Sequence, residues 1–333
     1  MKVIIPVAGL GSRLKPHTHT VPKPLLDVAG RPILEYIIED ALKLDPTEII
    51  FVVGHMKETI KKYILTHYPE INCSFIYQKT RDGDGSAIRL ALEKIDHEED
   101  LFILFGDTLA DFDIKFSLDS YKKADAVIFC MEVEDPIHYG IVNVKENMEI
   151  YQVEEKPENP KSNLALIGAY YFKSSLQVKH LLNDFYQKKE TVKGEYRLVQ
   201  VIEKYAKQRD TSIKASPVKK WFDCGRIEVL LEANKYFLKL KSKGGPIMKG
   251  TSIILPPSFV SQTAIIENSV IGPYASIGEG AKITDSIVKN SIICPKVKIE
   301  NLILTDSLLG KDVIVHGRPS KINIGEKSEI SLN

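Results

Sequence analysis

The residues after position 252 constrain the fold most, because apolar side chains recur there at every sixth position. The series comprises Ile253, Phe259, Ile265, Ile271, Ile277 and Ile283, then, after a step of four, Ile287, Ile293 and Ile299, and, after another, Ile303, Leu309 and Val315. A period of six fits neither a helix nor an ordinary strand, whose side chains repeat about every 3.6 and 2 residues. It is typical of a parallel β-solenoid, in which each hexad forms one face and three faces complete a coil. We therefore predict a hexapeptide-repeat β-helix over residues 253–333.

The chain before residue 240 has a different pattern, in which short apolar runs alternate with helical periodicity. The runs KVIIPV (2–7) and EIIFVVG (48–54) are typical of buried strands, and residues 32–44 between them have the apolar spacing of a helix. This alternation continues to residue 107 and predicts an α/β fold, a doubly wound and mainly parallel sheet of Rossmann-like type. We expect this domain to cover residues 1–240, with a cationic, glycine-containing linker over 241–252.

Charge and cysteine content exclude several classes of function. The 45 Lys and Arg against 44 Asp and Glu leave a net charge of +1, which gives no basic field for nucleic acid or an anionic membrane. The four cysteines form no CxxC pair, which argues against a disulfide framework and against a zinc site. No apolar run approaches the roughly 18 residues of a membrane span. We therefore expect a cytoplasmic protein with no nucleic-acid or membrane partner.

The loop VAGLGSRLKPHTHTVPKPL, residues 7–25, combines two glycines with cations and follows a predicted strand. Such glycines let backbone N–H groups approach a phosphate chain. The loop lacks the Walker pattern GxxxxGK[ST] and the third glycine of the dinucleotide fingerprint, so it belongs to neither class. His17 and His19 are expected to be ordinary polar loop residues. Predicted strands also end near Gln78 and Asp107, at the edge where doubly wound sheets bind ligands.

The segments GSRLKP and PKPLLDVAGRPIL together resemble the signature of sugar-1-phosphate nucleotidylyltransferases. The resemblance covers nearly the whole chain in the order of the family's motifs, which are matched by GDGSAI, FGDTL, HYGIV, EEKPENP, IGAYYF, GEYRL and WFDCG. Several branches of that family also carry a C-terminal left-handed β-helix. The resemblance implies an enzyme that transfers a nucleotidyl group from a nucleoside triphosphate to a sugar 1-phosphate and releases pyrophosphate.

The resemblance assigns roles to residues of the phosphate and metal motifs. The triphosphate would be cradled by Ala8, Gly9, Gly11 and Ser12. Arg13 would neutralise the β- and γ-phosphates and the leaving pyrophosphate, and Lys23 would hold the α-phosphate. Asp107 and Asp223 would hold one Mg²⁺, an ion that prefers carboxylate oxygens. The attacking phosphate, with a second pKa near ~6, is already ionised at neutral pH, so no general base is needed.

The resemblance also implies base and sugar contacts. The base would be bound by Gln78, Gly83, Gly85 and Ser86. Seven positions separate Gln78 from Gly85, where relatives commonly have about five, so either glycine could make the base contact. The sugar phosphate would be bound by Gly140, Glu155, Lys156, Gly168 and Glu195.

Two departures from the family favour a plain hexose. Relatives that take N-acetyl sugars carry Asn shortly before the glycine matched by Gly168, where this chain has Leu166 and Ile167, and Gln200 stands where many have Asp. We therefore expect a glucose-1-phosphate thymidylyltransferase-like enzyme. UTP stays open, because one methyl group is worth only about 1–3 kcal/mol in a pocket. A mannose-1-phosphate guanylyltransferase and a non-catalytic regulatory subunit are the alternatives, although such subunits tend to lose the metal aspartates or loop cations.

The predicted solenoid suggests assembly rather than a second reaction. Residues 253–315 contain no histidine, and His316 stands just past the last placed coil, so we do not expect acetyl transfer on this domain. A solenoid exposes flat faces that must be covered. We expect a homo-oligomer, and a chain ending near Lys249 that keeps nucleotidyl transfer but loses its assembly and some stability.

Overall fold

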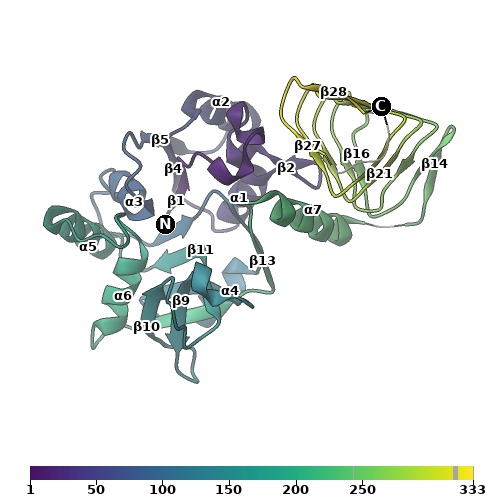
Figure 1. Ribbon diagram of the computed structural model, residues 1–333. Helices are drawn as coiled ribbons and strands as arrows, with labels where there is room; N and C mark the ends of the chain where they lie inside the picture. The colour runs from purple at the N-terminus through teal and green to yellow at the C-terminus, as the bar shows by residue number, and fades with distance from the viewer. Residues whose placement is uncertain (243, 318–321, 333) are drawn as a thin grey trace. The chain divides into compact units, whose positions relative to one another are not determined.

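The computed structural model describes residues 1–242, 244–317 and 322–332, and it divides into two compact units (Figure 1). Unit 1 comprises Met1–Gly9 and Tyr36–Trp221, and unit 2 comprises Leu10–Glu35 and the chain from Phe222 onward. The chain leaves unit 1 after β1 (Lys2–Val7), returns within α1 (Ile33–Leu42) and crosses again within β13 (Lys220–Asp223). Most of the predicted phosphate loop therefore groups with the solenoid. The domain limits predicted from the sequence, at residues 240 and 253, cut the chain into consecutive stretches, whereas each compact unit combines two separate stretches. Those limits stay a prediction.

Unit 1 is built on a nine-stranded sheet with the order β10-β9-β11-β6-β1-β4-β5, in which β8 pairs with β11 and β12. Its strands are β1, β4 (Glu48–Val53), β5 (Cys73–Tyr77), β6 (Leu101–Leu104), β8 (Ala126–Glu132), β9 (Gly140–Val144), β10 (Ile150–Glu155), β11 (Leu164–Phe172) and β12 (Ile213–Pro217). The predicted doubly wound parallel sheet is confirmed for β6, β1, β4 and β5. Beyond β6 the sheet is mostly antiparallel, because β11 runs against β6, β8 and β9.

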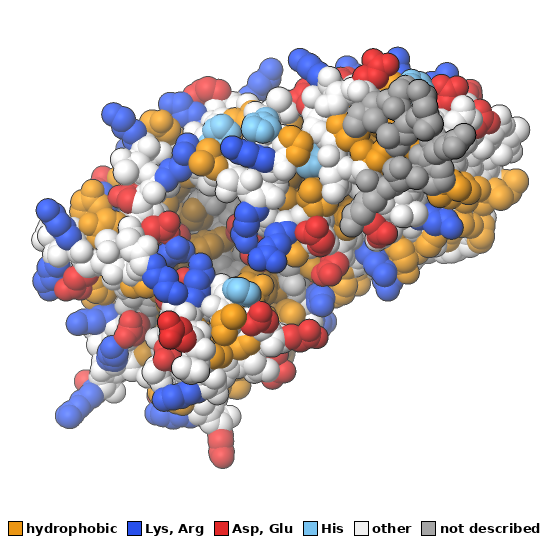
Figure 2. All heavy atoms as spheres, in the orientation of Figure 1, with side chains coloured by type: hydrophobic (Ala, Val, Ile, Leu, Met, Phe, Trp, Pro, Cys, Tyr) orange, Lys and Arg blue, Asp and Glu red, His pale blue; other side chains and the backbone are white. Residues whose placement is uncertain are grey.

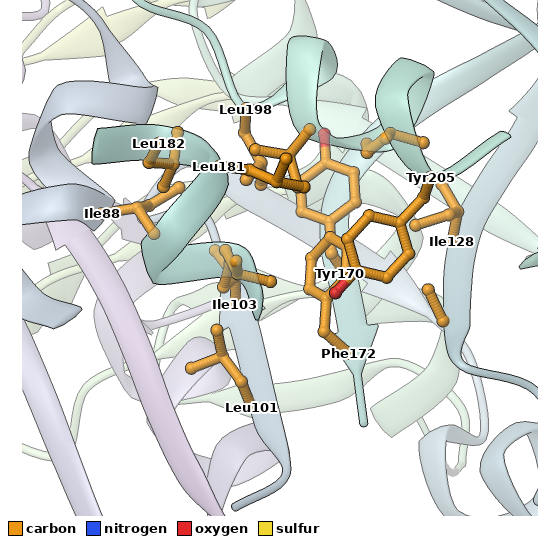
Figure 3. Close-up of a cluster of buried hydrophobic side chains, with 14 of the residues drawn as sticks. Ile88, Leu101, Ile103, Ile128, Tyr170, Phe172, Leu181, Leu182, Leu198 and Tyr205 are labelled. Atoms are coloured by element: carbon orange, nitrogen blue, oxygen red, sulfur yellow. The ribbon is translucent and has the colours of Figure 1, made fainter. Parts of the chain in front are cut away.

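Helices cover the faces of this sheet. They are α2 (Lys57–His67), α3 (Asp84–Leu92), α4 (Ile114–Ser120), α5 (Ser175–Lys188) and α6 (Val199–Lys207). The connections include β7 (Thr108–Asp111), between β6 and α4, and the 3-10 turn η4 (Pro136–His138), between β8 and β9. Aliphatic and aromatic side chains of α3, α5 and α6 meet those of β6, β8 and β11 in one buried cluster (Figure 3). Strands buried on both faces need nearly continuous apolar runs, which explains why LFIL and AVIFC contain no charge.

Unit 2 contains the predicted left-handed β-helix, confirmed as three sheets of five strands each among the described residues (Figure 1). The first sheet comprises β14 (Ile247–Lys249), β15 (Ser252–Ile254), β18 (Val270–Ile271), β21 (Ile287–Lys289) and β24 (Ile303–Thr305). The second comprises β16 (Phe259–Val260), β19 (Ser276–Ile277), β22 (Ile292–Ile293), β25 (Leu308–Leu309) and β27 (Asn323–Ile324). The third comprises β17 (Ile265–Glu267), β20 (Lys282–Thr284), β23 (Lys298–Glu300), β26 (Ile314–Gly317) and β28 (Glu329–Leu332).

The coils are shorter than three full hexads. Hydrogen bonds between equivalent positions span 17 residues in the first coils, then 16, then 15. The side chains that fill the solenoid are therefore partly offset from the predicted series: Ile271, Ile277 and Ile283 point inward, whereas Ile265 and Ile303 are exposed. The repeat also extends beyond Val315, so His316 lies within the solenoid, on β26, and pairs with Glu300 at 3.1 Å. The apolar series could be placed only as far as Val315, but the predicted solenoid reached residue 333, and β26 with His316 lies within that range.

Buried serines connect successive coils. Ser269 Oγ accepts the N–H of Ser286 at 3.0 Å, and Ser286 Oγ accepts the N–H of Leu302 at 3.1 Å. Each hydroxyl also donates to the carbonyl two residues before it, Ser269 to Glu267 and Ser286 to Thr284. The serines thus satisfy backbone groups that turn away from the strand ladders.

Segment 10–35 and α7 (Ile227–Lys241) complete unit 2. The segment contains three 3-10 turns, η1 (Ser12–Leu14), η2 (His17–His19) and η3 (Lys23–Leu25), and a hairpin of β2 (Asp27–Val28) and β3 (Arg31–Pro32). The hairpin turn at Gly30 lies against Phe259 of the second solenoid sheet. Outward side chains of that sheet, Ile292 and Leu308, are only 1% and 2% exposed.

Candidate active site

In unit 2 the loop glycines bring two cations to one carboxylate. Gly11 has a φ of +64° and precedes η1, and a Cβ there would lie 2.9 Å from Thr18 Cγ2 and 3.0 Å from Lys23 Cβ. Thr18 Oγ1 donates a hydrogen bond of 2.8 Å to the Gly11 carbonyl. Gly11 therefore permits both the left-handed turn and the close approach that folds Lys23 back onto the loop.

Arg13, Lys23 and Asp223 form the centre of this cluster. Arg13 Nη2 lies 3.7 Å from Asp223 Oδ2, and Lys23 Nζ lies 4.0 Å from Asp223 Oδ1. The Arg13 guanidinium rests on Gly225, where a Cβ would overlap it. The Arg13 side chain is 57% exposed and that of Lys23 only 10%, so Arg13 can reach a ligand in solvent while Lys23 is fixed by packing. Two cations around one acidic group can bind a phosphate chain together with its metal ion.

Unit 1 holds the predicted base-binding residues at the start of α3. Gln78 is 6% exposed and its Nε2 donates to the Gly83 carbonyl at 3.1 Å. The Gly85 N–H donates to the Tyr196 carbonyl at 2.9 Å. Gly83, at φ +121°, also lies against Tyr196, where a Cβ would overlap the Tyr196 carbonyl oxygen. Both glycines are therefore required by packing, and the Gly85 N–H is already used within the protein.

A buried ion pair that the sequence analysis missed fixes this segment. The Asp84 carboxylate accepts the N–H of Leu198 at 2.7 Å and pairs with Arg197 at 3.3 Å. Burial raises the pKa of Asp84, and these hydrogen bonds oppose the rise. Ser86, in the first turn of α3, is 3% exposed. Asp84 belongs to the motif GDGSAI, and Arg197 and Leu198 belong to the motif GEYRL. The sequence marks both segments, but it does not show that they pair.

Three predicted sugar residues meet through the pairing of β9 and β10. Gly140 is the ladder partner of Glu155, and a Cβ on Gly140 would lie 3.0 Å from Glu155 Oε2. Lys156, at φ +49°, donates its N–H to the Tyr139 carbonyl and keeps its Nζ 4.0 Å from Glu155 Oε1. Backbone geometry thus places a carboxylate and an ammonium together at the end of this hairpin.

Gly168 and Asp107 lie near Tyr170. Gly168, at φ +83°, sits in the irregular part of β11, where a Cβ would lie 2.7 Å from Thr108 Oγ1. Asp107 immediately precedes Thr108. Burial raises the pKa of Tyr170, and the charges of Asp84, Glu155 and Asp107 raise it further. Several carboxylates therefore surround one buried phenol.

Glu195 is partly exposed and pairs with Arg197 at 2.5 Å. The adjacent Lys193 donates from Nζ to the Lys156 carbonyl at 3.3 Å. The loop that carries Glu195 thus contacts the hairpin that carries Lys156.

The two predicted metal ligands belong to different units, Asp107 to unit 1 and Asp223 to unit 2. Among residues 1–242, 244–317 and 322–332, no group of three or more His, Cys, Asp or Glu side chains could hold a metal ion. A Mg²⁺ held by one or two carboxylates, waters and substrate phosphates needs no such group. Asp223 beside two phosphate-binding candidates fits this type of site.

His17 is not the polar loop residue that was expected. It is 3% exposed, and both ring nitrogens lack a hydrogen-bond partner within the described chain. Burial lowers the pKa of His17 from 6.5 to about 4. A neutral, buried imidazole is not a phosphate ligand, so its role in the loop is packing.

Within the ranges that the structure describes, no helix is both long and apolar enough to cross a membrane.

Known proteins are similar to this chain over most of its length. The family model described as nucleotidyl transferase matches residues 2–239. The protein named bifunctional protein GlmU of Methanocaldococcus jannaschii is 33% identical, over 98% of this chain and 84% of its own. The low-salt glycan biosynthesis nucleotidyltransferase Agl11 of Haloferax volcanii is 28% identical over the full length of both chains. A crystal structure of UDP-glucose pyrophosphorylase complexed with UDP-glucose is 26% identical, with a TM-score of 0.62 over 72% of this chain and 99% of that one. Names of other matching proteins divide among thymidylyl-, uridylyl- and guanylyltransferases.

Proposed function

The chain belongs to the nucleotidyl transferase family and is a sugar-1-phosphate nucleotidyltransferase; we propose that it uses dTTP or UTP and a hexose 1-phosphate, with glucose 1-phosphate as the first choice. The observation that carries the proposal is the cluster of Arg13 and Lys23 around Asp223. This cluster supplies the charge that a triphosphate requires. A regulatory subunit that only binds nucleotide sugar would not need it.

The proposed chemistry is an in-line displacement at phosphorus. An oxygen of the sugar 1-phosphate forms a bond to the α-phosphorus, and the bond from that phosphorus to the bridging oxygen breaks. The electron pair leaves with pyrophosphate. Lys23 would orient the α-phosphate, and Arg13 would neutralise the charge that grows on the leaving group. The nucleophile is already ionised, so none of the eight histidines is assigned a catalytic role.

Asp107 and Asp223 stay the proposed ligands of Mg²⁺. When bound, the ion would offset phosphate charge and act as a Lewis acid. Asp223 would hold it beside the two cations, and in the protein alone this carboxylate lies close to both Arg13 and Lys23 and offsets their mutual repulsion.

The geometry of Gln78 supports a base with a ring N–H. Its Nε2 donates to the Gly83 carbonyl, and we propose Oε1 as the acceptor for the base. Uracil, thymine and guanine each offer a ring N–H to such an acceptor, whereas adenine and cytosine offer a ring nitrogen that only accepts. We also propose Gly83 rather than Gly85 as the backbone contact, because the Gly85 N–H is bonded to Tyr196.

For the sugar, we propose that Glu155 accepts from ring hydroxyls and Lys156 binds the 1-phosphate. The support is their joint position at the end of the β9–β10 hairpin, against Gly140. Gly168 and Glu195 are proposed to line the ring. Leu166, next to Gly140, is apolar where an N-acetyl group would need a hydrogen-bonding partner.

We further propose that the protein is a homo-oligomer that associates through the first solenoid sheet. One row of ladder positions across that sheet is apolar and faces away from the solenoid core, namely Met248, Ile253, Val270, Ile287 and Ile303, while Lys289 lies beside it on β21. Met248 and Ile303 are 68% and 45% exposed, and Figure 2 shows hydrophobic side chains gathered along one side of the solenoid. The corresponding row of the third sheet is mixed, with Lys282 and Lys298 between Ile265 and Ile314. Since the second sheet carries apolar outward residues where the chain covers it, the first sheet has the composition of a covered face.

A pyrophosphate-release screen tests the proposed function. The protein would be incubated with each of ATP, CTP, GTP, UTP and dTTP and with glucose, mannose, galactose and N-acetylglucosamine 1-phosphates. Release with dTTP or UTP and glucose 1-phosphate is expected. Preference for GTP and mannose 1-phosphate would support the guanylyltransferase alternative, and no release with any pair would refute the catalytic assignment. Lys15→Ala, a neighbouring cation without an assigned role, is the matched control for Arg13→Ala.

A further inference from the structure

We infer that Asn234 of α7 is a positioning residue for the reaction: it ties the segment that carries Arg13 and Lys23 to the solenoid, so that the solenoid holds the phosphate-binding cations in place. The inference rests on the proposed function. It concerns contacts within unit 2 alone.

Asn234 joins three parts of unit 2. It is completely buried, and its Oδ1 accepts the N–H of Ala29 at 2.9 Å and the hydroxyl of Ser276 at 2.6 Å. Its Nδ2 donates to the carbonyl of Tyr274 at 3.0 Å. One carboxamide thus links the phosphate segment, α7 and the solenoid, and the hydrogen bonds to Ala29 and Ser276 are buried while that to Tyr274 is partly buried.

The turn that Asn234 holds cannot shift easily. Ala29 and Gly30 have φ values of +51° and +84°, which form the two-residue turn between β2 and β3. Gly30 is packed so closely on the Phe259 ring that a Cβ would overlap it. The hydrogen bond to Ala29 therefore fixes a turn that is already seated on the second solenoid sheet.

The segment also contacts the opposite end of that sheet. Pro16 lies against Gly325, where a Cβ would be 3.2 Å from Pro16 Cβ. Phe259 belongs to β16, the first strand of the sheet order, and Gly325 follows β27, the last. Lys23 lies between these two anchors along the chain. The solenoid thus fixes the segment on both sides of Lys23.

A catalytic ammonium must be placed within a fraction of an ångström to stabilise a transition state. Loss of the hydrogen bond between Ala29 and Asn234 should therefore lower kcat clearly even where the protein stays folded. This differs from the expectation, drawn from sequence alone, that a chain ending near Lys249 keeps nucleotidyl transfer. If the solenoid holds the cations, its removal costs catalysis as well as assembly.

The test compares full-length Asn234→Ala with Ser291→Ala. Ser291 is also completely buried and makes two hydrogen bonds within the solenoid, but none of them reaches segment 10–35. We expect Asn234→Ala to lower kcat at least 10-fold with a smaller change in KM, and to speed amide hydrogen exchange in peptides from 22–33 while solenoid peptides stay protected. Ser291→Ala should keep kcat within about 3-fold.

Asn234→Asp provides a variant that keeps the acceptor for Ala29, and it should retain more activity and more protection at 22–33 than Asn234→Ala. If Asn234→Ala does not fold, Asn234→Asp is measured in its place. Hydrogen exchange at 22–33 should then stay near that of the parent, and faster exchange there would contradict the inference. Unchanged kcat and exchange in folded Asn234→Ala, or equal losses in Asn234→Ala and Ser291→Ala, would overturn the inference. Failure of the parent protein to release pyrophosphate would refute the proposed function alone, because the exchange measurement still tests the anchor.

Discussion

Replacing His17 by leucine should remove a loss of stability that the parent protein shows as pH falls from about 6.5 to about 4. The imidazole is buried and neutral in the folded state, and burial lowers the pKa of His17 from 6.5 to about 4. In this window the unfolded chain takes up a proton that the folded chain cannot, so unfolding becomes more favourable as pH falls. Above pH 6.5 both states are neutral at this position, and below about 4 both are protonated.

The magnitude follows from the size of the pKa change. At roughly 1.4 kcal/mol for each pH unit, His17 should lower the free energy of unfolding by about 3 kcal/mol between pH 6.5 and pH 4. Leucine has no proton to take up and leaves no unpaired ring nitrogen in the apolar site. We therefore expect His17→Leu to be at least as stable as the parent near pH 7, and its advantage to increase toward pH 4.

Urea unfolding followed by circular dichroism at a series of pH values measures this difference. Carboxyl groups that titrate in the same range act on both proteins, so they cancel when the two free energies are subtracted. NMR of the imidazole resonances, with the His17 signal assigned by its absence in the variant, gives the pKa directly. A difference in stability that does not change with pH, or a His17 resonance that titrates near 6.5, would refute the reasoning.

Four further outcomes are expected. Asp27→Asn should stabilise the protein above pH 6, because burial, and then the charges of Glu35 and Glu279, raise the pKa of Asp27 to about 6. Ionisation of Asp27 in the folded protein costs stability above that pH, and this cost disappears as pH falls from about 6 to 3.8. Urea midpoints of both proteins at pH 5 and pH 7.5 measure the contrast. Arg13→Ala should lower turnover by about 10²–10³ and leave the fold intact, as loss of one preorganised charge does; wild-type turnover in the purified variant would contradict its role. EDTA should abolish pyrophosphate release, and Asp107→Asn should raise the Mg²⁺ concentration needed for half-maximal rate; full activity in EDTA would remove the metal from the scheme. Ile303→Lys should reduce the assembled mass in light scattering, and an unchanged mass would exclude the first solenoid sheet as the interface.

The sequence predicted the period of the solenoid but only part of its phase. Ile253, Ile287 and Ile303 were placed in the repeat series, whereas Val288 and Leu304 fill the interior. Apolar residues stand side by side there, so the period alone does not decide which one points inward. That choice depends on coils of 17, 16 and 15 residues, which are set by turn geometry.

The residues of the candidate site could be proposed from motifs, whereas most contacts between distant segments could not. The resemblance assigned Arg13 and Lys23 to the phosphates and Asp223 to Mg²⁺; the structure brings these three side chains together, and their roles stay a prediction. The links from Asp84 to Leu198 and from Ala29 to Asn234 join residues more than 100 positions apart, and nothing in the local pattern of either partner indicates them. The buried state of His17 was hidden for the same reason. The cytoplasmic location stays a prediction from composition.

The contacts of segment 10–35 with both ends of the second solenoid sheet restrict how the protein could gain or lose repeats. In most repeat proteins each unit touches only its neighbours, so a whole unit can be inserted or deleted with little effect elsewhere. One added coil here would lengthen the sheet by about 4.8 Å between Phe259 and Gly325. The segment would have to release Pro16 or Gly30, or stretch and displace Lys23. The number of coils between these two contacts is therefore a fixed dimension of this protein, in contrast to the variable length that solenoids usually allow.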